Sequence, residues 1–216
     1  MVAHTIHMNK KIKTFLFLIP CLIFGEGALA QNSGLSLSDS SKDHALQDSA
    51  FVYEIPFKTN FKARLIQGYH GFLSHKNEYA NDFKVKPGTP ICAARSGVVI
   101  KVKEDSKERG LKRKFLKKGN YIVVQHNDST CAGYWHLQFN GAKVSVGDTV
   151  KNGEVIGFSG NSGYSAFPHL HFMVFKYVGN KTKTIPVKYK TQRGMCRLRP
   201  GRKYFKPAAD SIVKDN

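Results

Sequence analysis

Short β-runs dominate the chain from residue 52 onwards and constrain its fold more than any other feature. Segments rich in Val, Ile, Tyr and Phe alternate with Gly-containing bends, and they cover Thr89–Val102, Tyr121–Gln125, Ala132–His136, Val150–Phe158 and His169–Tyr177. Runs of this kind between turn residues are typical of strands. The sequence contains no amphipathic helical pattern longer than the 106–118 region. We therefore predict an all-β fold, a compact antiparallel β-sheet or barrel-like sandwich with little helix.

Two closely spaced turns support a compact sheet. The segment VGDTVKNGEVIG (146–157) places Gly147 and Gly153 about six residues apart, as expected where a short strand turns back along a sheet or barrel. The segment also resembles the hairpins of lipoyl- or biotin-carrier domains. It has no lysine at the expected hairpin tip, and a carrier domain would leave the histidines described below unexplained.

The first thirty residues have the features of a signal peptide. Lysines lie between residues 10 and 13, an apolar stretch too short to span a bilayer follows at 15–24, and Ala28-Leu29-Ala30 forms an A-x-A cleavage signal. Cleavage would leave Gln31 as the first mature residue and remove Cys21, whereas a retained membrane anchor is the alternative. We predict an exported protein, periplasmic or extracellular.

The remaining residues divide into three segments. Residues 31–50 are rich in Ser and Asp and predict a flexible N-terminal tether. We assign residues 51–200 to one folded domain, which is large enough to bury a core. Residues 201–216 are assigned to a basic C-terminal tail.

The charge of the chain is strongly positive, at +19, and residues 1–30 contribute three Lys and one Glu, so that +17 remains after cleavage. Such a charge attracts polyanions, including cell-wall polymers and anionic lipids. Residues 101–118 hold nine Lys or Arg against three acids, and we interpret them as a solvated hairpin extension rather than a dedicated binding patch. No nucleic-acid motif accompanies them, so no specific nucleic-acid partner is expected.

Three cysteines follow the signal peptide: Cys92, Cys131 and Cys196. Export permits one disulfide, and Cys92 with Cys131 is the candidate pair, although the sequence leaves the connectivity open. None has the paired spacing of a zinc-thiolate site, and nothing nearby resembles an activated thiol.

Candidate site residues gather around the segment SGNSGYSAFPHLHF (159–172), which ends in His169 and His171. Side chains at i and i+2 of a strand leave the same face about 7 Å apart, so both imidazoles are expected in one site. This arrangement suits a metal or acid–base chemistry, although an incidental hydrogen-bonded pair is the alternative.

Asp82 and two further histidines extend the set. Asp82 follows His75 by seven residues within an apolar strand pattern, and burying its charge is costly without a cation, either a basic side chain or a metal. His136 lies in the aromatic segment YWHL, where a core histidine is the alternative. A catalytic zinc takes three N or O ligands and keeps one position for water. His75, Asp82 and one histidine of the pair give such an open set, and the two histidines left over suit proton transfer or oxyanion stabilisation.

Four motifs in order, GFLSHKNEYANDFKVKPGTPICAARSGVV, NYIVVQH, YWHLQ and VSVGDTVKNGEVIGFSGNSGYSAFPHLHF, resemble the lysostaphin/LytM-type zinc metallo-endopeptidases. These are peptidoglycan hydrolases with the duplicated hybrid motif fold, and the resemblance covers about residues 60–190. It implies an antiparallel β-structure with a zinc-containing groove and one Zn²⁺ per chain. It also implies that His75, Asp82 and His171 are the zinc ligands and that His136 and His169 are the catalytic histidines.

The spacing of the first two ligands departs from the simplest family pattern, because six residues separate His75 from Asp82. A loop-expanded branch of the family shares this feature. His70 is the rival first ligand, and His126 in the QHND turn is assigned a hydrogen-bonding role. Asn81 and Lys84 replace apolar residues that are usual in the family.

The resemblance implies hydrolysis of amide bonds in peptidoglycan stem peptides or cross-links by zinc-activated water. We expect a monomer, and the basic surface would keep it on an anionic wall. The competing hypothesis is a non-catalytic wall-binding module that activates a separate amidase. Degenerate relatives usually lack one or more of the metal residues, and the presence of all five positions favours an enzyme. The sequence does not choose between a D-amino acid cross-link and a glycine bridge.

Overall fold

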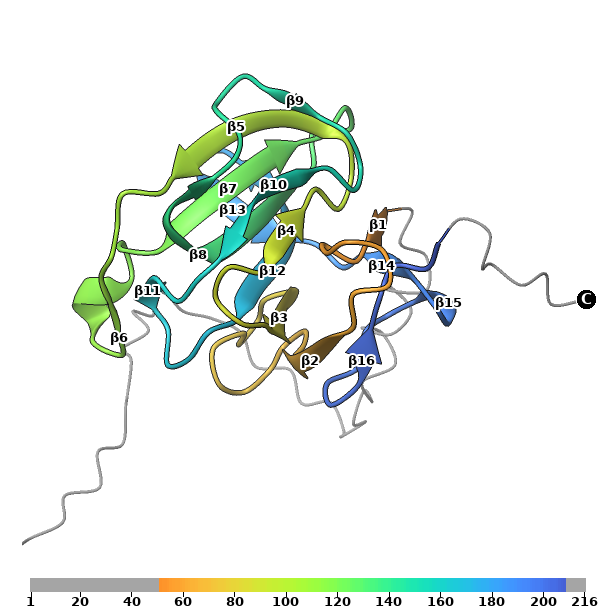
Figure 1. Ribbon diagram of the computed structural model, residues 1–216, viewed down its shortest axis with the longest axis horizontal. Coiled ribbons are helices and arrows are strands. Elements are labelled where there is room, and N and C mark those ends of the chain that lie inside the picture. Colours follow the sequence, from red (N-terminus) through yellow and green to blue (C-terminus); the bar gives the residue numbers. More distant parts are fainter. Residues whose placement is uncertain (1–50, 209–216) are drawn as a thin grey trace, which may run out of the picture. The chain divides into compact units, whose positions relative to one another are not determined.

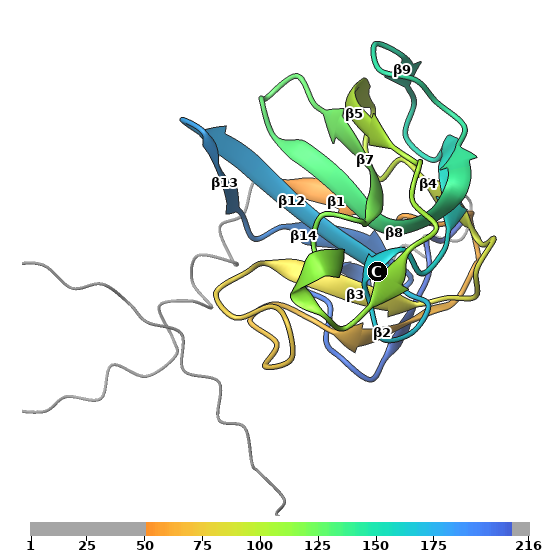
Figure 2. The same ribbon diagram turned by 90° about the vertical axis from the view of Figure 1, so that its left-hand side faces the viewer.

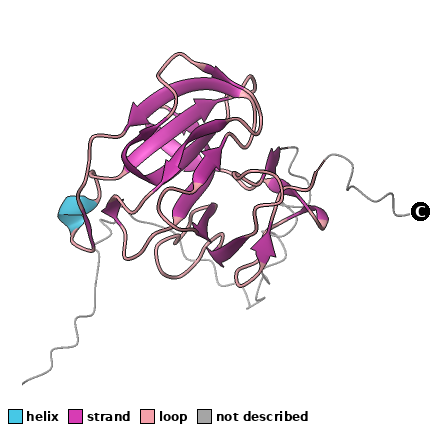
Figure 3. Cartoon of the chain, in the orientation of Figure 1, coloured by secondary structure: helices cyan, strands magenta, loops and turns pink. Residues whose placement is uncertain are grey.

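The computed structural model describes residues 51–208, and strands make up nearly all of its regular structure (Figure 3). The predicted signal peptide (1–30), the predicted tether (31–50) and residues 209–216 lie outside the described residues. Within residues 51–208, the single helical element is the 3-10 helix η1, Arg113–Phe115. No helix in this range is long and apolar enough to cross a membrane. The all-β prediction is confirmed.

The strands of the described part form three sheets (Figure 1). The largest has eleven strands, all paired antiparallel; its main path is β16-β2-β3-β12-β8-β7-β5-β9, while β10 pairs with β4 and β8, and β13 pairs with β12. The smaller sheets are β1-β14-β15 and β11-β6. The strand bounds are β1 Val52–Glu54, β2 Ala63–Gln67, β3 Ala80–Lys84, β4 Pro90–Cys92, β5 Gly97–Lys103, β6 Arg109–Gly110, β7 Asn120–Gln125, β8 Cys131–Ala142, β9 Thr149–Val150, β10 Val155–Ser159, β11 Gly163–Tyr164, β12 Leu170–Val178, β13 Lys181–Thr184, β14 Lys188–Thr191, β15 Gly194–Cys196 and β16 Lys203–Tyr204.

Strand β12 organises the centre of the large sheet, between β3 and β8 (Figure 2). Its alternate residues Leu170, Phe172 and Val174 are buried in the core. The pleat of the strand turns His171 and Met173 to the opposite face, where they are half-buried. The sequence pattern therefore gives β12 one core face and one face available to a site.

The core consists of aromatic and aliphatic side chains. It lies on the face of the large sheet opposite to that of His171. Tyr53, Phe83, Ile91, Tyr134 and Phe172 are each at most 1% exposed. Burying a large apolar side chain contributes roughly 1.5–3 kcal/mol each. This packing fixes the strands that carry the site residues.

Two of the predicted strands differ from those in the structure: one is divided and the other is longer. The run Thr89–Val102 is interrupted after β4, because Ala93 and Ala94 leave the strand and bond to Glu54, Gly153 and Glu154 instead. The run predicted for Ala132–His136 is longer, since β8 continues to Ala142. The predicted turns at Gly147 and Gly153 are present, with φ of 99° and 82°, values that glycine adopts without steric cost.

The basic region 101–118 connects β5 to β7, which pair antiparallel, as expected for a hairpin extension. It is not only a solvated loop. Its strand β6 pairs in parallel with β11, just before the segment that carries His169 and His171. The extension is therefore attached to the edge of the predicted site.

The predicted domain boundary at residue 200 is too early. Lys203–Tyr204 form β16, which pairs with β2. Tyr204 is only 2% exposed, and its hydroxyl oxygen accepts a hydrogen bond from the Arg199 backbone N–H at 2.8 Å. The start of the predicted basic tail thus belongs to the folded sheet.

The candidate disulfide between Cys92 and Cys131 is wrong. Both cysteines are buried and free, and Cys196 is free as well. Cys92 ends β4 and pairs with β10, whereas Cys131 begins β8 and lies opposite β7 and β12. Burial raises the pKa of both thiols, so they behave as small core residues.

Candidate metal centre

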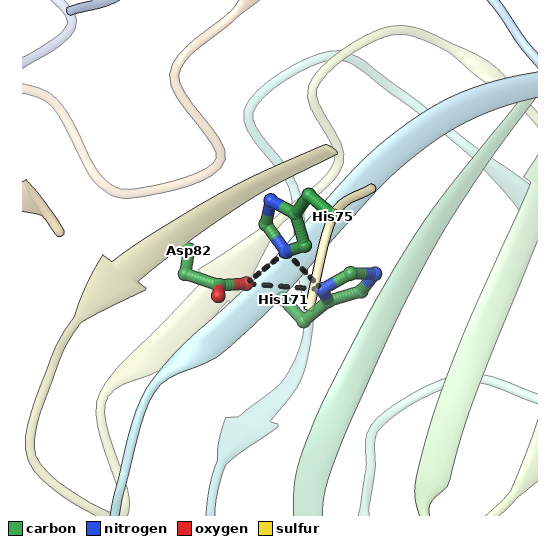
Figure 4. A group of neighbouring side chains, drawn as sticks. All are labelled: His75, Asp82 and His171. Carbon is green, nitrogen blue, oxygen red and sulfur yellow. Dashed lines mark hydrogen bonds and ion pairs between the residues drawn. The ribbon is translucent and has the colours of Figure 1, made fainter. Parts of the chain in front are cut away.

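Three of the predicted site residues converge on one point (Figure 4). Asp82 of β3 and His171 of β12 are directly opposite each other in the sheet, and His75 reaches them from the 68–79 connection between β2 and β3. The Asp82 Oδ1 atom lies 2.9 Å from His171 Nδ1 and 3.2 Å from His75 Nε2, and the two nitrogens are 3.2 Å apart. His75 is fully buried and Asp82 is 6% exposed.

The three donor atoms fit a zinc ion. Ligand atoms about 2.0–2.1 Å from a tetrahedral zinc lie about 3.3 Å from one another, close to the distances between these atoms. Two imidazole nitrogens and one carboxylate oxygen are also the donor types of catalytic zinc sites. The arrangement therefore provides three corners of a tetrahedron with one position left open.

Neighbouring polar groups orient the donors. The Gly68 carbonyl oxygen lies 3.0 Å from His75 Nδ1; because a carbonyl only accepts, Nδ1 carries the hydrogen and Nε2 of the neutral ring keeps its lone pair. The second oxygen of Asp82, Oδ2, accepts a hydrogen bond from Gln67 Nε2 at 3.1 Å. Gln67 Nε2 also donates to Ser74 Oγ, and its Oε1 accepts from the Leu73 backbone N–H. Such outer partners fix the tautomers and angles of metal ligands.

The charges within this group are strongly coupled. Burial by itself would raise the pKa of Asp82, but its contacts with His171 and His75 outweigh burial and hold that pKa well below its ordinary range. Burial would lower the pKa of His75, whereas its contact with Asp82 raises it, and the net pKa is above the ordinary value. The carboxylate is therefore kept ionised and able to bind a cation.

His136 lies beside the group in a special backbone conformation. Its φ is 64°, a left-handed value that is uncommon for a residue other than glycine. The pairing of β8 with β7 shifts here, since Leu137 lies opposite Asn120 and Trp135 opposite Tyr121, which leaves His136 as the extra residue of a β-bulge. Bulges redirect side chains at functional sites. The His136 ring centroid lies 4.6 Å from that of His169 and 6.0 Å from that of His171.

The two remaining histidines share one protonation pattern. His136 Nδ1 lies 2.7 Å from the Ser162 carbonyl oxygen, and His169 Nδ1 lies 2.8 Å from that of Phe167. Each Nδ1 therefore donates, and each neutral ring keeps an unprotonated Nε2 with a free lone pair. Burial, followed by the charges of His169 and His171, lowers the pKa of His136 to about 3. Burial also lowers the pKa of His169, whose Nε2 is 3.7 Å from Asp82 Oδ1.

The rival histidines lie outside the group. His70 packs edge-on against Tyr79 with ring centroids 4.5 Å apart, and it is not one of the three converging residues. His126 contacts the Ser96 carbonyl oxygen through Nδ1 at 2.8 Å, in keeping with the hydrogen-bonding role expected for it.

Asn81 faces the core, where its side chain donates to the Tyr189 hydroxyl at 2.8 Å. Asn81 is not among the residues that line the groove described below.

A groove of about 480 Å³ contains the site. Asp82, His136, His169 and His171 line it together with apolar residues from three connecting segments, namely Leu73, Leu111, Leu116, Tyr164, Ala166 and Phe167. The sequence did not identify Gln67 or these apolar residues as site residues. Two signals were available: Tyr164, Ala166 and Phe167 lie in the segment 159–172 that carries the histidine pair, and Leu111 and Leu116 are apolar residues within a basic run. Gln67 follows an ordinary strand pattern and gave none.

Comparisons with known proteins identify a family and several relatives. The sequence profile described as "Peptidase family M23" matches residues 76–186. An "Uncharacterized metalloprotease" of Buchnera aphidicola is 40% identical over 136 residues, covering 61% of this chain and 33% of that protein. Lysostaphin of Staphylococcus simulans is 34% identical over 117 residues (54% of this chain, 22% of that protein). The "Peptidoglycan DD-endopeptidase ShyC" of Vibrio cholerae is 33% identical over 114 residues (53% and 23%).

Among solved structures, the catalytic domain of lysostaphin from Staphylococcus simulans aligns with a TM-score of 0.42 and 31% identity, covering 57% of this chain and 87% of that one. The chain spans only 22% to 33% of the length of the three curated relatives named above. The family profile, in contrast, covers slightly more than half of this chain and includes Asp82, His136, His169 and His171. The chain belongs to peptidase family M23.

Proposed function

We propose that this chain is an exported zinc metallo-endopeptidase that hydrolyses amide bonds in peptidoglycan stem peptides or cross-links, as a monomer with one Zn²⁺. The observation that carries the proposal is the convergence of His75 Nε2, Asp82 Oδ1 and His171 Nδ1, whose donor atoms all lie within 4.8 Å of one another. These three residues are the proposed ligands. Export rests on the predicted signal peptide.

Each proposed ligand is suited to hold the ion. The pKa of Asp82 lies well below its ordinary range, so the carboxylate supplies a full negative charge. Gly68 and Gln67 hold His75 and Asp82 in orientation from outside the group. Zinc bound at these atoms would polarise the scissile carbonyl and lower the pKa of a water molecule.

His136 and His169 are the proposed catalytic residues. Each is neutral, and its hydrogen bond to a backbone carbonyl leaves Nε2 unprotonated at the groove. Such a nitrogen can accept the proton that the attacking water loses and can then give it to the leaving amine. Once protonated, the same imidazole stabilises the oxyanion of the tetrahedral intermediate.

Peptidoglycan is the proposed substrate because one of the relatives, from Vibrio cholerae, is named a peptidoglycan DD-endopeptidase. The net charge of +17 that would remain after cleavage of the predicted signal peptide supports attraction to an anionic wall. The competing function, a non-catalytic module that activates an amidase, would not require three convergent ligands beside two histidines with unprotonated Nε2 atoms. Their joint presence favours hydrolysis.

Mass spectrometry of fragments released from purified sacculi tests the proposal, with the zinc-loaded protein and its His171→Ala variant run side by side. We expect new peptide ends from the wild type alone, and their masses would identify the bond that is cut. The variant should also lose bound zinc. Failure of the wild type to release fragments from several wall types would instead support the non-catalytic module.

A further inference from the structure

A second cavity, of about 740 Å³, lies at the C-terminal end of the described chain. It is formed by the β14–β15 hairpin and the segment that leads to β16, and it shares no lining residue with the groove of the metal centre. One lysine, four arginines and several apolar residues line it: Lys188, Arg193, Met195, Cys196, Arg197, Leu198, Arg199, Pro200, Arg202 and Tyr204. None of these lining residues is acidic.

The backbone that carries the arginines is held firmly by the fold. The Leu65 backbone N–H donates to the Arg202 carbonyl at 2.9 Å, and the Gly201 N–H donates to the Leu65 carbonyl at 2.8 Å. Leu198 and Tyr204 are buried beneath the segment. The side chains of Arg193, Arg199 and Arg202 nevertheless stay exposed. The result is a preformed concave surface whose charged groups reach solvent.

We propose that this cavity binds the phosphate groups of an anionic polymer. The planar guanidinium group offers paired N–H donors that match a phosphate bidentately, and it cannot lose its proton. The exposed groups of Arg193, Arg199 and Arg202 lie around one cavity and repel one another, and an anion with several charges relieves that repulsion. A cavity of this volume has room for more than one phosphate of a chain, which favours a polymer over a single ion.

Binding in this cavity would anchor the domain, a role that is separate from the proposed hydrolysis and goes beyond the proposed function. A Cβ atom added at Gly68 would lie 3.3 Å from Pro200 of the cavity wall, and the Gly68 carbonyl is the group that orients His75. The Arg197 guanidinium lies 5.7 Å from the Tyr69 ring centroid. A polymer bound in the cavity would hold the domain at the wall while the groove, which shares no lining residue with the cavity, stays free. The lining residues also lie beyond the 76–186 span of the family profile.

Isothermal titration of the full chain with linear inorganic polyphosphate of one chain length, at several salt concentrations, tests the proposal. The cavity variant combines Arg193→Gln, Arg199→Gln and Arg202→Gln. The matched control, Lys112→Gln with Arg113→Gln and Lys114→Gln, removes the same charge from η1 and its N-cap within the densest basic run. We expect the cavity variant to lose affinity roughly 30-fold or more. Its log–log salt slope should become shallower by about 2, as for the loss of three phosphate contacts. The control should change by less than about threefold.

Several outcomes would overturn the proposal. Equal losses in the two variants would assign binding to the overall charge rather than to the cavity, and absence of wild-type binding would remove it altogether. Equal affinity for polyglutamate of the same charge would refute phosphate recognition. Tighter, cavity-dependent binding to phosphatidylglycerol vesicles would replace the polymer with a membrane surface. The titration buffer contains a metal chelator. The result is therefore independent of zinc loading and of sacculus hydrolysis. Circular dichroism of each variant verifies its fold.

Discussion

Replacing Gln67 by Met is expected to weaken zinc binding without touching a proposed ligand. Gln67 is 6% exposed, lies opposite Asp82 in the pairing of β2 with β3, and donates to Asp82 Oδ2 at 3.1 Å. Methionine has a similar volume but no amide. The substitution therefore removes the hydrogen bond that fixes the plane of the carboxylate, while Oδ1 keeps its neighbours His75 and His171.

The magnitude follows from the groups left without partners. Loss of an outer partner of a metal ligand typically costs 10–100-fold in affinity, or about 1.4–2.7 kcal/mol. The backbone N–H of Leu73 also loses its acceptor, Gln67 Oε1. We expect the free energy of unfolding to fall by about 1–3 kcal/mol. Competition with a chromophoric chelator measures the zinc affinity, and chemical denaturation of the metal-free protein measures the stability.

Asn81→Leu is the matched control for this experiment. Asn81 also carries a buried amide next to Asp82 in β3, but its side chain donates to Tyr189 on the core face of the sheet. We expect this variant to be destabilised with its zinc affinity unchanged. If Gln67→Met binds zinc within about threefold of the wild type, or if both variants lose zinc equally, Gln67 does not position Asp82 as argued.

Three further predictions concern other parts of the chain. His136→Ala should retain zinc and lose turnover; loss of zinc in metal analysis would place His136 among the ligands. Gly160→Ala should lower the free energy of unfolding by about 1–3 kcal/mol in denaturant titrations, because the added Cβ would lie 2.5 Å from the Gln138 backbone nitrogen; an unchanged midpoint would contradict this. Burial lowers the pKa of His126, so the unfolded chain binds the extra proton below about pH 6.5. As the pH falls from about 6.5 to the pKa of His126 in the folded protein, the free energy of unfolding of the wild type should therefore decrease more steeply than that of His126→Gln. Parallel pH profiles of the two proteins would refute this prediction.

The sequence predicted the strand that carries the site because its period is simple. The alternation of Leu170, His171 and Phe172 follows from the pleat, and it places the histidine on the face opposite the core. The prediction of strand boundaries was weaker. The run from Thr89 to Val102 contains no strong breaker at Ala93–Ala94, where hydrogen bonds from distant segments end the strand.

Other features needed contacts between distant segments and had no local signal. Gln67 and Asp82 are 15 residues apart and meet through sheet register. The left-handed backbone at His136 arises from a mismatch between β7 and β8. The sequence left the pairing of Cys92 with Cys131 open for the same reason, since local sequence does not specify which strands become neighbours, and the structure shows both cysteines free.

The sequence by itself determined the residue types of the site and the all-β class, because side-chain chemistry and strand period are local properties of the chain. Tertiary structure decided how the donor atoms of His75, Asp82 and His171 come together, since that depends on the register of β3 against β12 and on a connection returning from β2. It also decided that the arginines beyond residue 190 surround one cavity. Their charges are evident in the sequence, but their proximity results from the pairing of β16 with β2, a contact between the two ends of the described chain.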